Sequence, residues 1–105
     1  MQKIVKEFNE YVKIKAHKKQ MPVSARMLDI ESEVGELSKE VLKSTSYGTK
    51  DFVVTEDFKL ELGDVLYSVL SMAEEVGVDS KNCLEMVIKK YKARVDGTGN
   101  MGRDG

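Results

Sequence analysis

The sequence contains few of the residues that support disulfide, thiol or imidazole chemistry, with one cysteine and one histidine in 105 residues. A single cysteine cannot form a disulfide within the chain. No histidine or second cysteine lies near Cys83 in sequence, which argues against a nucleophilic thiol. Cys83 shares a helical apolar stripe with Val87, so we predict that it packs in the core.

Long hydrophobic runs are also missing. No apolar stretch approaches the ~20 residues that a membrane-spanning helix needs. The first residues, MQKIVKEFNEYVK, are amphipathic and charged, unlike a secretory signal. We therefore expect a cytoplasmic protein that has no membrane partner.

The chain has no large excess of either charge, since its net charge is −1, but the charges are unevenly distributed. Residues 1–20 carry six lysines against two glutamates, whereas residues 21–64 carry ten acidic and five basic side chains. No aromatic residue interleaves with the basic residues that end the first segment: Lys15, His17, Lys18 and Lys19. We interpret this segment as a solvated helix face and expect no nucleic-acid partner.

Strand signals are absent, because no segment alternates apolar and polar residues. The apolar fraction of 41% and charged fraction of 33% are typical of a globular protein, and the length fits one domain. We predict an all-α fold, a four-helix bundle over residues 1–96, followed by a flexible glycine-rich tail at residues 97–105. The expected helices include or span residues 4–14, 22–43, 55–76 and 80–95.

Local signals set these helix boundaries. The only proline, Pro22, suits the first turn of the second helix. Either Asp51 or Thr55 can start the third helix, after a polar loop at residues 44–51. Gly77 is expected to end the third helix in the C′ position, and Asp79 or Ser80 caps the fourth.

The second and third helices share a short pattern of carboxylate, apolar residue, glycine and carboxylate. It occurs as Glu33-Val34-Gly35-Glu36 and as Glu61-Leu62-Gly63-Asp64. Residues three apart on a helix project from nearly the same face, so each copy presents two carboxylates together. Each pair adjoins an apolar stripe, and we therefore expect the carboxylates at the edge of the core.

Four carboxylates near a helix seam repel one another and would be costly to bury without a positive partner. Oxygen ligands without histidine or cysteine suit hard cations, so Mg²⁺ is the first choice and Mn²⁺ the second. Ferritin-like di-iron sites need Glu-x-x-His motifs, and the only histidine, His17, lies elsewhere in the sequence. The alternative is an acidic helix face that only contacts solvent. Because the pattern occurs twice, on consecutive helices, we favour the metal site over this alternative.

Glycine within a helix costs about 1 kcal/mol relative to alanine, so the matching positions of Gly35 and Gly63 need an explanation. They either let another helix or a ligand approach the metal site, or they serve close helix packing alone. Glu40 and Asp57 extend the two acidic faces by one turn as outer residues.

Mg²⁺ bound by carboxylates usually keeps waters and binds substrate phosphates, which indicates a polyphosphate substrate. Two adjacent ions can neutralise phosphate charge and lower the pKa of a bound water. Basic side chains should then hold the remaining phosphates. The candidates are Lys59, Lys89, Lys90, Lys92 and Arg94.

Together, Glu33-x-x-Glu36, a spacer of 24 residues and Glu61-x-x-Asp64 resemble the MazG-like family of all-α nucleoside triphosphate pyrophosphohydrolases. The similarity covers about residues 25–95, including Gly77-Val78-Asp79 and Lys90 with Arg94. One difference is that many members have asparagine three residues before the helix-four arginine, where this chain has Tyr91.

The resemblance implies a Mg²⁺-dependent enzyme that cleaves nucleoside triphosphates between the α and β phosphates. It implies metal ligation and catalysis by Glu33, Glu36, Glu61 and Asp64, with phosphate contacts from Lys90 and Arg94. It also implies that a homodimer or homotetramer completes the bundle.

The nucleoside would lie near the first helix, where Phe8 and Tyr11 are the stacking candidates, with Tyr47 and Phe52 in the loop region. Core or loop packing is the alternative role for each of these rings. Two other functions remain open from the sequence: a non-catalytic regulatory module that binds Mg²⁺ and a nucleotide, and a structural helical oligomer.

Overall fold

The computed structural model describes residues 1–17 and 19–98, with nothing but α-helices and connecting segments among them. The helices are α1 (Gln2–Ala16), α2 (Val23–Ser44), α3 (Glu56–Val76) and α4 (Ser80–Thr98). The predicted all-α fold with four helices is confirmed. Lys18 of the basic segment and residues 99–105 of the predicted tail lie outside the described residues.

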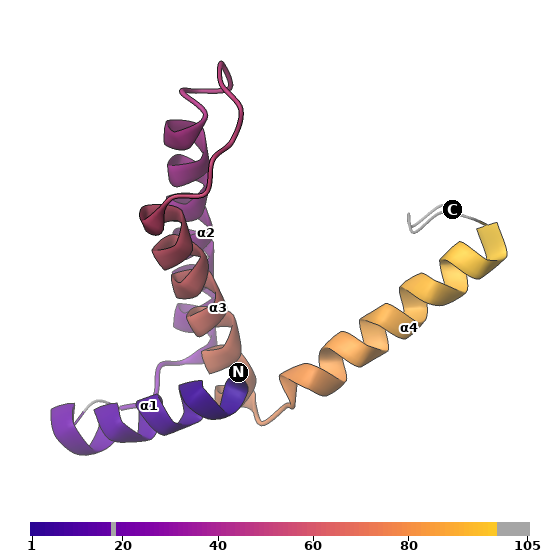
Figure 1. Cartoon of the computed structure of the whole chain (residues 1–105). Helices are drawn as coiled ribbons and strands as arrows, with labels where there is room; N and C mark the ends of the chain where they lie inside the picture. Colours follow the sequence, from indigo (N-terminus) through magenta and orange to yellow (C-terminus); the bar gives the residue numbers. More distant parts are fainter. Residues whose placement is uncertain (18, 99–105) are drawn as a thin grey trace.

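Helices α2 and α3 form an antiparallel hairpin, and α1 crosses the end of it at which α3 finishes (Figure 1). Thr55 caps α3 by accepting a hydrogen bond from the Phe58 backbone N–H at 3.0 Å. Gly77 ends α3 in a left-handed conformation with φ 75°, which glycine adopts without a Cβ penalty. The boundaries expected from Pro22, Thr55 and Gly77 are therefore confirmed.

Helix α1 is attached to α3 by polar side chains as well as by apolar contact. Val5 is buried, and Asn9 bonds to both Ser71 and Tyr67 of α3 at 3.2 and 2.6 Å. Other apolar residues of α1, such as Ile4 and Ile14, stay exposed.

Helix α4 leaves the hairpin at Gly77 and runs away from α1, α2 and α3 (Figure 1). Cys83 is consequently exposed, and its predicted place in the core is wrong for the single chain. The apolar stripe of α4 does exist, but the other three helices do not cover it. Helix α4 also continues to Thr98, so the first two residues of the predicted tail are helical.

The core of one chain is thin. Its buried apolar residues are Val5, Leu70 and Ala73. Members of the expected apolar stripes, including Val34, Leu62 and Val69, are instead 40–45% exposed. None of the four described helices is both long and apolar enough to cross a membrane. The exposed stripes leave apolar surface on the hairpin that one copy of the chain does not hide.

Candidate metal centre

The antiparallel hairpin brings carboxylates from α2 and α3 to one place. Glu33 of α2 and Glu61 and Asp64 of α3 each offer an oxygen atom, and these oxygens all lie within 4.8 Å of one another. Glu61 and Asp64 point the same way because they are three residues apart on one helix. Glu33 and Glu61 are half-buried, while Asp64 is exposed, so the cluster lies at the edge of the hairpin as expected.

Glu36, the fourth predicted ligand, lies beside this cluster and not within it. Its side chain is 51% exposed and pairs with Lys39 at 3.5 Å. Its negative charge still acts on the cluster, since it contributes to the raised pKa values of Glu33 and Glu61.

The pKa of Glu33 is raised above its ordinary value. Partial burial, which disfavours the charged carboxylate, is the largest cause. The remaining causes are like charges from four neighbouring carboxylates: Asp64, Asp29, Glu61 and Glu36. Glu33 therefore carries a negative charge that its surroundings oppose.

The pKa of Glu61 is raised for the same reasons, with partial burial again the first. The like charges that follow come from Asp64, Glu36, Glu40 and Asp57. The last two are the outer residues expected from the sequence, and they do extend the acidic surface. Glu40 is partly neutralised by Lys43, whose Nζ lies 3.7 Å from its carboxylate.

The donor atoms of the cluster fit a hard divalent cation. All of them are carboxylate oxygens, the ligand type that Mg²⁺ prefers. Oxygens bound to one Mg²⁺ at about 2.1 Å span no more than about 4.2 Å, so small side-chain rotations would close the 4.8 Å spread. The softer donors are far away in the fold, with His17 at the end of α1 and Cys83 on α4.

Comparison with known protein families decides the assignment. The family model described as the MazG nucleotide pyrophosphohydrolase domain matches residues 22–97. The chain belongs to this family. No curated protein and no solved structure matches the chain. The matched region of the MazG domain contains α2, α3, nearly all of α4 and every proposed metal ligand, but it leaves out α1.

The two glycines of the repeated acidic pattern have open space around them. A Cβ added to Gly35 or to Gly63 would meet nothing within 4 Å. Close helix packing within the chain therefore does not explain either glycine. The remaining prediction is that these glycines let a ligand, or a helix of another copy of the chain, approach the metal site.

The basic side chains proposed for phosphate binding do not meet the carboxylates within one chain. Lys90 and Arg94 lie on α4, which runs away from the hairpin, and both lie over the ring of Tyr91, at 5.5 and 6.0 Å from its centroid. Lys89 and Lys92 share that helix, and Lys59 pairs with Glu56 at 2.9 Å. For the four candidates on α4, the direction of this helix is the reason, and no local sequence signal predicts that direction.

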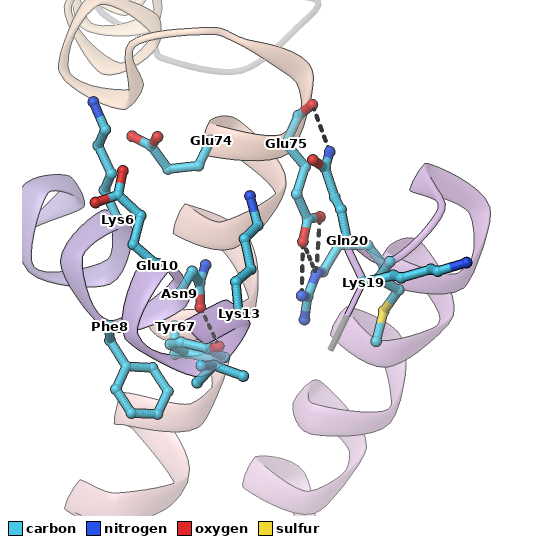
Figure 2. Close-up of a pocket in the computed structure, with 13 residues that line it drawn as sticks. Lys6, Phe8, Asn9, Glu10, Lys13, Lys19, Gln20, Tyr67, Glu74 and Glu75 are labelled. Atoms are coloured by element: carbon cyan, nitrogen blue, oxygen red, sulfur yellow. Dashed lines mark hydrogen bonds and ion pairs between the residues drawn. The ribbon is translucent and has the colours of Figure 1, made fainter. Parts of the chain in front are cut away.

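A cavity of about 570 Å³ lies between α1 and the adjoining ends of α2 and α3 (Figure 2). Phe8 lines it, edge-on to Tyr67 with ring centroids 5.9 Å apart. Tyr11, which is not a lining residue, stacks against Phe8 with ring centroids 6.2 Å apart. Of the loop aromatics, Tyr47 is 77% exposed and Phe52 packs on Phe58 at 4.9 Å. Phe8 is thus the predicted aromatic residue that the structure places in a cavity wall.

Sequence reasoning missed the polar residues of this region, although a signal for them exists. Tyr67 follows Asp64 by three residues, so it extends the carboxylate face toward the cavity by one turn. Its hydroxyl donates to Asn9 Oδ1 at 2.6 Å. Arg26 and Glu75, which also line the cavity, likewise continue the acidic faces of their helices at spacings of three and four.

Proposed function

We propose that this MazG domain is a Mg²⁺-dependent pyrophosphohydrolase. It would hydrolyse ribo- or deoxyribonucleoside triphosphates between the α and β phosphates, giving the monophosphate and pyrophosphate. The observation that carries the proposal is the carboxylate cluster of Glu33, Glu61 and Asp64 inside the region matched by the family. Control or cleaning of the cytoplasmic nucleotide pool is the corresponding role.

In this proposal, the four acidic residues of the repeated pattern bind the metal. Glu33, Glu36, Glu61 and Asp64 would bind Mg²⁺, with Mn²⁺ as a substitute. When bound, Mg²⁺ would neutralise phosphate charge and lower the pKa of a water molecule that it holds. Hydrolysis adds one water across the α–β anhydride and releases a proton, for which carboxylate oxygens of the same group are the available acceptors.

The cavity beside α1 suits the nucleoside. Tyr67 of the cavity wall lies one helical turn from Asp64, so a nucleotide with phosphates at the carboxylates can extend its base toward Phe8. Stacking on Phe8, with Tyr11 behind it, would hold the base.

A homodimer or homotetramer accounts for two features that one chain leaves unexplained. Apolar residues of α2, α3 and α4 are exposed, which is costly in water unless another surface covers them. Since α4 points away from its own cluster, Lys90 and Arg94 would contact phosphates bound to a neighbouring copy.

Product analysis tests the proposed reaction. Purified protein is incubated with canonical and modified nucleoside triphosphates plus Mg²⁺, and pyrophosphate and monophosphate are quantified. Glu36→Gln should lose the activity, whereas Glu31→Gln, an exposed glutamate on the same helix outside the cluster, should keep it. Release of orthophosphate in place of pyrophosphate would show that a different phosphate bond is cleaved, and it would refute the proposal. Nucleotide binding without any product would establish a regulatory binding module instead.

A further inference from the structure

A buried polar network joins α2 to α3 next to the carboxylate cluster. Arg26 of α2 donates to both carboxylate oxygens of Glu75 on α3, from Nε at 3.0 and 3.2 Å and from Nη2 at 2.8 Å (Figure 2). Its Nη1 donates to Asp29 Oδ2 at 2.9 Å. The same Asp29 oxygen accepts a hydrogen bond from Ser68 Oγ of α3 at 2.7 Å.

Three of the four residues of this network are nearly removed from water. Arg26 is 8% exposed and Ser68 3%, and the Glu75 side chain is 8% exposed. The Asp29 side chain is 28% exposed. Burying such ions brings a desolvation penalty that offsets much of their attraction, so a buried ion pair adds little net stability. What it does impose is geometry, because the planar guanidinium bonds well in one orientation only.

The Asp29–Ser68 hydrogen bond of the network is one helical turn from the proposed metal ligands on both helices, and the Arg26–Glu75 ion pair lies further along the hairpin. Asp29 precedes Glu33 by four residues, and Ser68 follows Asp64 by four. Among residues 1–17 and 19–98, every side-chain hydrogen bond between α2 and α3 comes from this network. The polar contacts that define how far α2 slides along α3 therefore begin one helical turn from the cluster, at Asp29 and Ser68.

The cluster itself depends on that register, because Glu33 comes from α2 while Glu61 and Asp64 come from α3. A slip of one residue along a helix displaces a side chain by about 1.5 Å. Mg²⁺ requires near-ideal octahedral geometry at about 2.0–2.1 Å, whereas Ca²⁺ accepts looser arrangements. A small loss of register would consequently weaken Mg²⁺ more than Ca²⁺.

We propose that the Asp29–Ser68 hydrogen bond and the Arg26–Glu75 ion pair are positioning contacts for the metal centre. They set the register of α2 against α3 and so keep Glu33 within reach of the cation that Glu61 and Asp64 bind. This inference rests on the proposed function, since it presupposes that the cluster binds a divalent cation.

Ser68→Ala tests the proposal, and the chain offers a matched control in Ser71→Ala. Both serines are buried on α3, but Ser71 accepts its hydrogen bond from Asn9 of α1 and not from α2. Binding of Mn²⁺ is measured by electron paramagnetic resonance, with Mg²⁺ and Ca²⁺ as competitors. We expect Ser68→Ala to weaken Mn²⁺ and Mg²⁺ binding about 10-fold or more and Ca²⁺ binding less, while Ser71→Ala changes none of them.

Equal metal affinity in wild type and Ser68→Ala, or equal losses in both serine variants, would overturn the positioning role. Glu75→Gln is the second variant if Ser68→Ala does not fold. It keeps the side-chain shape and lies about three helical turns from Asp64, and we expect it too to lower the Mg²⁺-to-Ca²⁺ affinity ratio.

The experiment separates this inference from the proposed function. Wild-type protein that binds no Mn²⁺ would overturn the metal centre and the inference with it. Wild-type protein that binds Mn²⁺ but releases no pyrophosphate would overturn the proposed activity alone, and the two serine variants would still decide the positioning role.

Discussion

Glu61→Gln should change the thermal stability of the protein in opposite directions without and with a divalent cation. Without metal, the negative charge of Glu61 is opposed by partial burial and by four neighbouring carboxylates, as its raised pKa records. Glutamine removes that charge, so we expect the metal-free variant to melt at a higher temperature than wild type at pH 7.5. With metal, wild type gains a bound cation that the variant holds poorly.

The size of the metal effect follows from chain length and mass action. A cation at 100 times its Kd stabilises the native state by about 2.7 kcal/mol. Unfolding 105 residues at about 2.1 cal/mol/K each gives an entropy of about 220 cal/mol/K, so Tm should rise by about 12 °C. If losing one ligand weakens binding at least about 100-fold, the variant gains no more than about 2 °C.

Differential scanning fluorimetry with and without Mn²⁺ measures both effects. Glu31→Gln, which also removes one carboxylate from the hairpin surface but lies outside the cluster, should behave as wild type in both conditions. Equal Mn²⁺-induced shifts in wild type and Glu61→Gln would refute the metal centre. A metal-free Glu61→Gln protein that is less stable than wild type would refute the electrostatic reasoning.

Three further outcomes are expected. Because Glu33 and Glu61 bind protons more tightly in the native than in the unfolded state, metal-free stability should fall as pH rises above their ordinary value of 4.5. Urea unfolding of Glu33→Gln should show a shallower fall, and an unchanged pH profile would contradict this. Phe8→Ala should raise KM about 10-fold with kcat nearly unchanged, which steady-state kinetics would show, whereas an unaltered KM would remove Phe8 from the nucleoside site. Leu70→Ala should cost about 2–5 kcal/mol in urea unfolding, and a loss below 1 kcal/mol would mean that this position is not core.

Features of this fold that depend on neighbours in sequence were predictable. The Thr55 cap and the Gly77 terminus are local events, and they lie where the sequence places them. The pairing of Glu61 with Asp64 follows from helix geometry alone, and the resemblance over α2 and α3 indicated that Glu33 would face them.

Features that depend on how helices meet were not predictable in this way. Cys83 and Val87 form a real stripe on α4, but periodicity says nothing about whether another helix covers it. The Arg26–Glu75 contact joins residues 49 positions apart. Helical spacing places each residue on the acidic face of its own helix, but nothing local predicts that the two side chains meet or that they are buried. The same holds for Ser68, whose side chain is too small and polar to suggest a core position.

The cavity is lined by two parts of the chain, one inside and one outside the region that the family model matches. Its α2 and α3 walls lie inside the matched region, with the carboxylates, while the wall that carries Phe8 and Asn9 lies on α1, outside it. Under the proposed function, substitutions on α1 would alter which base the cavity admits while the carboxylates of α2 and α3 stay unchanged. In that arrangement, substrate preference and chemistry would be separable traits.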